Sequence, residues 1–237
     1  MTEVELTISS QRAEPSPFRL IATLGVAGMI SGLALSSVYQ ITDPIIRANN
    51  QRELEEAVLE VVPGAAGMQE VVLTNAEATK TIYAAYDGDD LFLGYAIEGS
   101  TNEGFAGQIR LIYGYDPSIK RVVGMKVLES LETPGLGDKI KKEKNPAFAA
   151  QFENLAIEPT IVVVKDGKDQ DNEIDAITGA TISSNAVVDA INTENKSWLQ
   201  YLPATPPARE ERDLTNEEDR EAASGEGDDA ATDGGGE

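Results

Sequence analysis

The chain has 237 residues and a formal net charge of −22, with neither cysteine nor histidine. An excess of acid this large argues against nucleic-acid binding, which depends on neutralising phosphates with basic side chains. The missing residue types exclude disulfides, iron–sulfur clusters, zinc sites built on Cys or His, and histidine-based acid–base catalysis, so any redox chemistry requires an organic cofactor.

The first 42 residues predict a flexible start and a membrane span. Residues 1–19 are polar, and we expect them to be flexible. Residues 20–42 contain no charged side chain and are long enough to cross the hydrocarbon core as a helix. Within them, Gly28 and Gly32 allow close helix packing in a membrane, and Tyr39 suits the interface.

Two alternatives to a membrane anchor are less suitable. A cleaved signal peptide needs a cationic start and a shorter apolar core, and this start is not net cationic. A buried soluble helix is rarely this long without a polar face. We therefore expect an uncleaved single span. Its orientation stays open, because Arg12 and Arg19 on one side are balanced by Arg47 and Arg52 on the other.

A second helix is expected after the span. Asp43 followed by Pro44 is typical of a helix start, with the Asp as N-cap and the Pro at the first position. Apolar residues then recur at helical spacing as far as Pro63 and Gly64. Residues 43–63 are therefore predicted to form a stalk helix.

The folded domain is predicted to cover residues 64–202 and to belong to the α+β class. Short alternating segments separated by turn residues predict strands at 71–74, 81–86, 91–99, 108–115 and 121–130. Their links are too short for helical crossovers, so the sheet should be mostly antiparallel.

Helices and one more strand should complete the domain. A helix is expected over 138–152, broken near Asn145–Pro146, and a strand over 160–167. A packing helix should follow from Ser183, with Trp198 in the core. Residues 203–237 contain too few large apolar side chains to fold and are predicted to form a disordered acidic tail.

One stretch before that last helix suggests chemistry. Residues 175–184 carry four hydroxyl side chains, and Gly179 and Ala180 are small. A glycine turn that leads into a helix presents free backbone N–H groups at the positive end of the helix dipole, which suits a phosphate. An ordinary helix start capped by Ser or Thr explains the same pattern, and the residues alone do not decide between the two.

Three motifs behind a single span together resemble one family. They are residues 104–111 (GFAGQIRL), 128–139 (LESLETPGLGDK) and 175–181 (DAITGAT). The chain resembles the G subunit of Rnf-type electron-transport complexes, an FMN-binding family related to the C subunit of the sodium-pumping NADH:quinone reductase. The resemblance covers about residues 20–202.

The resemblance implies a covalent flavin. In the family, FMN is attached through its phosphate to the last Thr of the motif, which corresponds to Thr181. A separate flavin transferase installs it from FAD and recognises the surrounding motif, here Asp175, Thr178, Gly179, Ala180 and Thr181. Two positions, Thr178 and Ser183, exchange Ser and Thr relative to many family members and keep the hydroxyl.

The resemblance also implies where the flavin lies. The expected cofactor-binding residues beyond the motif just named are Ser183 and a loop that forms one wall of the site, Glu132, Thr133, Pro134, Gly135, Leu136 and Gly137. Glu132 either tunes the flavin electrostatically or caps that loop. Phe105, in the connection 104–107, is expected to pack near the ring. No metal site and no catalytic side chain are predicted.

The implied function is electron transfer by a membrane-anchored flavoprotein within an ion-translocating ferredoxin:NAD oxidoreductase complex. The domain is expected on the extracytoplasmic side of the cytoplasmic membrane, in contact with other subunits and without independent turnover. The alternatives are the C subunit of a sodium-pumping NADH:quinone reductase, a cofactor-free extracytoplasmic scaffold module, and an FMN-dependent enzyme with its own substrate.

Overall fold

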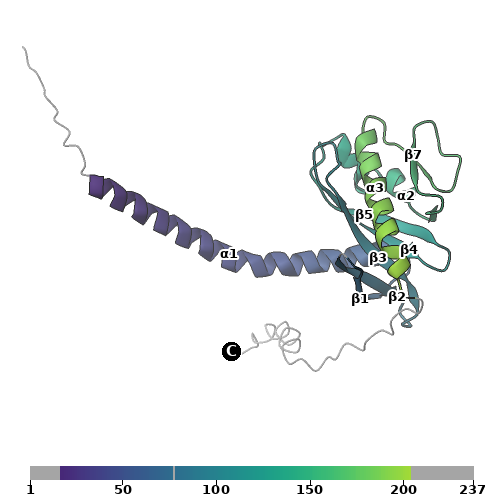
Figure 1. The fold of residues 1–237 in the computed structure, drawn as a ribbon, viewed down its shortest axis with the longest axis horizontal. Helices are drawn as coiled ribbons and strands as arrows, with labels where there is room; N and C mark the ends of the chain where they lie inside the picture. Colours follow the sequence, from purple (N-terminus) through teal and green to yellow (C-terminus); the bar gives the residue numbers. More distant parts are fainter. Residues whose placement is uncertain (1–16, 77, 204–237) are drawn as a thin grey trace, which may run out of the picture. The chain divides into compact units, whose positions relative to one another are not determined.

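A computed structural model describes residues 17–76 and 78–203 (Figure 1). The predicted acidic tail and most of the predicted flexible start lie outside these residues. By its contacts the chain divides into two units between Leu54 and Glu55. The predicted α+β class, a long apolar helix followed by an antiparallel sheet with packing helices, is confirmed.

Helix α1 (Pro17–Val61) is continuous, so the expected helix start at Asp43 is wrong. Asp43 does not cap a new helix; its carboxylate accepts a 2.8 Å hydrogen bond from Nε of Arg47, one turn later. Pro44 lacks an N–H but has a φ angle that a helix tolerates, and the helix continues through it. Residues 17–19, expected to be flexible, form the first turn.

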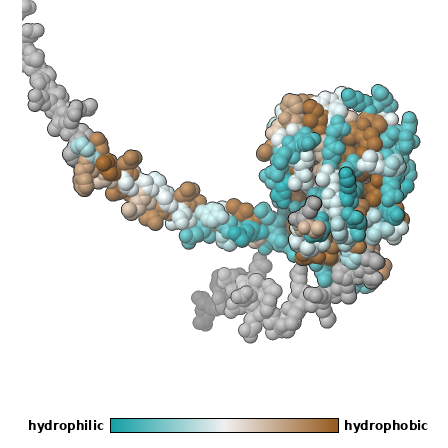
Figure 2. Space-filling view, in the orientation of Figure 1, coloured by the Kyte–Doolittle hydropathy of each residue, from teal (hydrophilic) through white to brown (hydrophobic). Residues whose placement is uncertain are grey.

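The first part of α1 is apolar on all sides. Among the described residues, α1 is the one helix long and apolar enough to cross a membrane. Large side chains such as Leu24, Leu33 and Val38 are exposed. The face of this part of the helix that Figure 2 shows is largely hydrophobic. A helix without a polar face is typical of a membrane span.

The main sheet has six antiparallel strands in chain order. The five predicted strands are confirmed within a few residues, and β6 is an unpredicted addition of two residues at the edge. The strands are β1 (Gly67–Thr74), β2 (Thr79–Tyr86), β3 (Phe92–Thr101), β4 (Ile109–Asp116), β5 (Arg121–Ser130) and β6 (Leu155–Ala156).

Helix α3 (Thr181–Trp198) packs on one face of this sheet (Figure 1). Alternate residues of β4 point toward it, and the Tyr113 hydroxyl donates a 2.8 Å hydrogen bond to Asn195 of the helix. Burial raises the pKa of Tyr113 well above its ordinary value, so this hydroxyl keeps its proton and remains a donor. Trp198 is buried, as predicted for a core residue.

The last turns of α1 pack on the other face. Ala57, Val58 and Val61 are buried. Gly114 and Gly124 pair directly across β4 and β5, and a Cβ on either would overlap the backbone carbonyl of Val61. These turns therefore belong to the second unit, which begins at Glu55 rather than at residue 64.

An ion-pair network secures the same turns. Glu60 pairs with Lys126 of β5 at 2.8 Å and with Lys142 at 2.7 Å. Hydrogen bonds from these two ammonium groups lower the pKa of Glu60, so its carboxylate stays ionised to lower pH than a free glutamate.

The segment between β5 and α3 is less regular than predicted. In place of one helix over 138–152 there are two short ones, η1 (Gly137–Ile140) and α2 (Pro146–Ala150). The predicted restart at Asn145–Pro146 is confirmed, because the Asn145 side chain accepts a 3.3 Å hydrogen bond from Phe148 N–H.

A small second sheet follows. The predicted strand at 160–167 shrinks to β7 (Val162–Val164), which pairs in parallel with β8 (Glu173–Asp175). After α3 the described chain ends with a turn of 3-10 helix, η2 (Leu199–Tyr201).

We expect Gly124→Ala to destabilise the second unit by about 1–3 kcal/mol, because the added methyl overlaps backbone that cannot rotate away. Urea unfolding of the detergent-solubilised chain, followed by fluorescence of its single tryptophan, Trp198, measures this loss. Gly88→Ala is the matched control, since a Cβ at Gly88 meets nothing within 4 Å. Its stability should stay within about 0.5 kcal/mol of the wild type. Equal losses in both variants would contradict the proposed packing.

Candidate functional site

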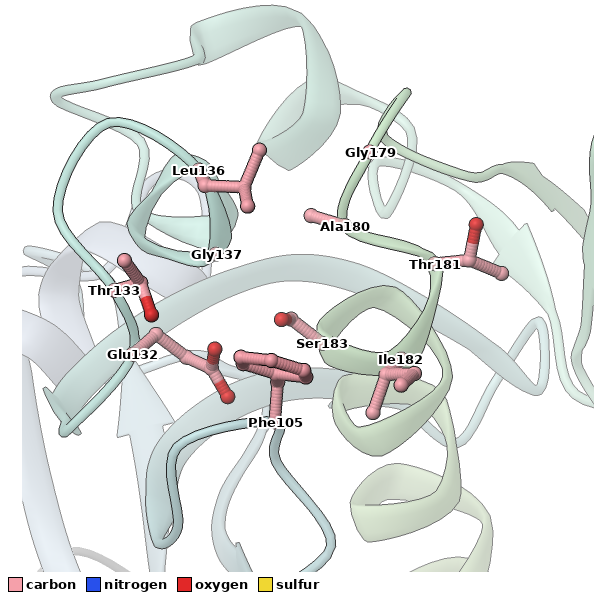
Figure 3. A pocket seen from close by; sticks show the side chains of 10 residues that line it. All are labelled: Phe105, Glu132, Thr133, Leu136, Gly137, Gly179, Ala180, Thr181, Ile182 and Ser183. Atoms are coloured by element: carbon pink, nitrogen blue, oxygen red, sulfur yellow. The ribbon is translucent and has the colours of Figure 1, made fainter.

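A cavity of about 270 Å³ lies where three loops meet (Figure 3). Its wall comes from the β3–β4 connection, the segment after β5, and the start of α3. The lining residues are Phe105, Glu132, Thr133, Leu136, Gly137, Gly179, Ala180, Thr181, Ile182 and Ser183.

Strand pairing brings two of these loops together. Ile109 at the start of β4 pairs with Ser130 at the end of β5, and Leu131 N–H continues the pairing to the Gln108 carbonyl at 3.2 Å. Because the strands are antiparallel, the residues that precede β4 and those that follow β5 lie at the same edge of the sheet.

Eight of the twelve predicted cofactor-binding residues line this cavity, as does the weaker candidate Phe105. Four do not. Pro134 and Gly135 lie at the exposed tip of the loop, where Gly135 has a φ of +79° and its N–H donates to Asp138 at 2.7 Å. Thr178 is exposed outside the cavity. Asp175 is the fourth.

Asp175 has a structural environment of its own. It ends β8, and its backbone exchanges hydrogen bonds with the Gln151 side chain, at 2.6 Å to Oε1 and 3.3 Å from Nε2. Its Oδ1 is buried without a partner in the described structure. Asp175 is therefore held against the Gln151 side chain and does not line the cavity.

The N-terminus of α3 is not capped by a side chain. Its N-cap is Ala180, and Thr181 is the first helical residue, two positions before the predicted start. Within the described residues, no hydrogen bond uses the backbone N–H of Thr181, Ile182 or Ser183. A capping side chain would accept from the N–H of Ile182 or Ser183, and all three N–H groups lie at the positive end of the helix dipole.

The turn before α3 is held in place by a buried hydroxyl. Ser184 Oγ accepts a hydrogen bond from Ile177 N–H and donates one to the Ala180 carbonyl, both at 3.0 Å. Gly179 has a φ of +82°, which favours glycine. Neither of these hydrogen bonds uses the side chain of Thr181 or Ser183, and in Figure 3 the Thr181 side chain points away from Leu136 and Phe105.

Glu132 is the one charged side chain that lines the cavity. It is 6% exposed, and its Oε1 accepts a 3.3 Å hydrogen bond from Ala106 N–H. Its Oε2 is buried and has no partner in the described structure. A Cβ at Gly104 or Gly137 would overlap this carboxylate, so both glycines provide the space that it occupies.

The mouth of the cavity is apolar. Phe105, Leu136 and Ile182 are 66%, 42% and 52% exposed. In Figure 3 Phe105, Glu132 and Ser183 lie together on one side, and Thr181 lies on the opposite side. The arrangement suits a flat, partly apolar ligand with an anionic group near the helix N-terminus and a hydrogen-bond donor near Glu132.

Comparison with known proteins is consistent with this geometry. Residues 104–194 match the FMN-binding domain family. Over 190 residues the chain is 30% identical to the G subunit of the ion-translocating oxidoreductase complex of Methanosarcina acetivorans, covering 78% of this chain and 94% of that one. It is 28% identical over 187 residues to the G subunit of the Na⁺-translocating ferredoxin:NAD⁺ oxidoreductase complex of Acetobacterium woodii, covering 74% and 88%.

A solved structure shares the fold. The crystal structure of the C subunit of the Na⁺-translocating NADH-quinone reductase of Parabacteroides distasonis matches with a TM-score of 0.54 at 16% identity. The match covers 68% of this chain and 97% of that one.

The packing of Glu132 against Gly137 can be tested by a double-mutant cycle. We expect Gly137→Ala to cost about 1–3 kcal/mol, because its methyl would press on the Glu132 carboxylate and the Ser183 hydroxyl. Glu132→Ala frees that space, so the double variant should lose about 0.5–3 kcal/mol less than the sum of the single losses. Urea unfolding measures all four proteins. The control pair, Glu132→Ala with Gly88→Ala, should show additive losses. Additive losses for Glu132→Ala with Gly137→Ala would contradict the contact.

Proposed function

This chain belongs to the family of G subunits of ion-translocating oxidoreductase complexes, and from that premise we propose that it carries electrons through FMN held at the start of α3. The family assignment rests on the 30% identity to the G subunit of Methanosarcina acetivorans across 78% of this chain. The apolar part of α1 anchors the chain in the membrane.

The observation that carries the proposal is the uncapped N-terminus of α3. Three backbone N–H groups there lack partners in the described structure, and the Thr181 hydroxyl is beside them. A phosphate ester on Thr181 would place its anionic oxygens among these donors. The residues present therefore fit the phosphate end of FMN.

The rest of the cavity fits the ring end. Phe105, Leu136 and Ile182 offer apolar contact to a flat ring, and the small Gly179 and Ala180 let a bulky group approach the backbone. The unpaired Oε2 of Glu132 fits a ligand that carries an N–H. When bound, the flavin supplies the redox chemistry that no side chain of this sequence can supply.

We propose that the attachment is covalent and uses Thr181. The Thr181 Oγ1 forms a bond to the FMN phosphorus of FAD, the pyrophosphate bond breaks, AMP leaves, and the hydroxyl proton is released. A flavin transferase would catalyse this step, and Thr181 is only half-buried, which leaves it open to such an enzyme. Thr178 and Asp175 lie outside the cavity, so they would contribute to recognition of the motif rather than to the bound flavin.

The proposed partners are the other subunits of a ferredoxin:NAD oxidoreductase complex, as the names of the relatives in Acetobacterium woodii and Clostridium ljungdahlii indicate. Electrons enter and leave most directly at the apolar mouth of the cavity. We propose that the second unit lies on the extracytoplasmic side of the membrane, where these subunits would meet it.

Replacing Thr181 tests the attachment. The wild-type chain, produced with an active flavin transferase, should give a fluorescent band on a denaturing gel under ultraviolet light. Thr181→Ala should abolish the fluorescence because it removes the ester oxygen, whereas Thr181→Ser and Thr178→Ala should retain it at least in part. Intact-mass spectra identify the attached group. Flavin retained on Thr181→Ala would refute the assignment, and a wild-type chain without flavin would refute the proposed function.

A further inference from the structure

We propose that Glu132 is a positioning residue that sets the flavin potential: its Oε2 accepts a hydrogen bond from an N–H of the flavin ring, and its negative charge opposes reduction of the ring. This inference rests on the proposed function, and it assigns Glu132 the first of the two roles that the sequence left open.

The first step is the unsatisfied oxygen. Buried polar atoms in folded proteins nearly always have a hydrogen-bond partner, and leaving one without a partner is costly. Glu132 is 6% exposed as a residue, and Ala106 N–H donates only to Oε1 of its carboxylate. Oε2 has no partner among the described residues, and because Glu132 lines the cavity, we assign the missing donor to a ligand bound there.

The second step is that the site is built around this charge. Gly104 and Gly137, from two different loops, leave room for the carboxylate that any side chain would fill. If the carboxylate served only to hold the loop through Ala106 N–H, one oxygen would be sufficient. We therefore assign the second oxygen, Oε2, to a contact with a ligand.

The third step is the orientation that a bound flavin would take in the cavity. In Figure 3 Glu132 lies beside Ser183, on the side of the cavity opposite Thr181. A flavin whose phosphate is attached to Thr181 would therefore extend its ring across the cavity toward Glu132. Oxidised flavin has one ring N–H, in its polar pyrimidine portion, and this group can donate to a carboxylate.

The fourth step determines the direction in which Glu132 shifts the reduction potential of the flavin. None of the ten lining residues is basic, so no cation in the wall of the cavity neutralises Glu132. A buried charge acts strongly on its neighbours because little water screens it. A negative charge beside the ring disfavours added electrons and lowers the reduction potential.

The test replaces Glu132 with glutamine, which keeps an acceptor for Ala106 N–H and removes the charge. A potentiometric titration of the full-length, flavin-loaded chain should show an upward shift in midpoint. At fixed potential, the ratio of reduced to oxidised flavin should rise at least tenfold, about 30 mV for a two-electron couple. Glu132→Asp keeps the charge and should retain most of the low potential.

Glu129→Gln is the control for net charge. Glu129 is on β5, three residues before Glu132, but it is exposed and paired with Arg110 outside the cavity, so removing its charge should leave the potential unchanged. A midpoint in Glu132→Gln that equals the wild-type value, or falls below it, would overturn the inference while leaving the proposed function intact. A wild-type chain that carries no flavin would overturn both.

A second measurement does not depend on the potential. In a Thr181→Ala background, which is expected to lack flavin, Glu132→Gln should raise the unfolding temperature by roughly 2–8 °C, because it removes an unpaired buried charge. In the flavin-loaded chain the gain should shrink or reverse, since the carboxylate then has its donor. An equal effect in both backgrounds would count against the hydrogen bond.

Discussion

The pairing of β4 with β5 is the constraint on which the rest of the second unit depends. Its register places Gly114 opposite Gly124, which opens one face of the sheet to the end of α1. The same register pairs Ile109 with Ser130, so the loops before β4 and after β5 meet at one edge. One set of backbone hydrogen bonds therefore fixes both the end of the membrane helix and two walls of the cavity.

Much of this could be predicted from local patterns. Alternating apolar residues and turns such as Asp87–Gly88 predicted five strands, and the short links between them predicted the antiparallel pairing that the structure has. The loop 132–137 and the turn before α3 were recognised from their motifs, and the structure brings both to one cavity.

Other features depend on contacts between distant residues. The parallel pairing of β7 with β8 was missed because each strand has only three residues and lacks a periodic pattern. Continuity through Pro44 was missed because Asp–Pro is a common helix start, and only the structure shows that Asp43 bonds to Arg47. The burial of Glu132 was also invisible, although Gly104 and Gly137 were a signal: glycines in two loops indicate that something needs their space.

The described structure leaves three buried side-chain atoms without partners, and their places are informative. One is on Glu132 in the cavity, another is on Asp175 at the end of β8, and the third is Nδ2 of Asn195 near the C-terminal end of α3. Scaffold sites avoid such atoms because each one reduces stability. Functional sites retain such atoms where a bound ligand supplies the missing hydrogen-bond partner. Elsewhere in the unit both oxygens of Glu60 pair with lysines, and Asn195 Oδ1 accepts a hydrogen bond from Tyr113. Of the three atoms, Oε2 of Glu132 is the one that belongs to a residue lining the cavity, and the pairing of β4 with β5 holds the loop that carries it at the edge of the sheet.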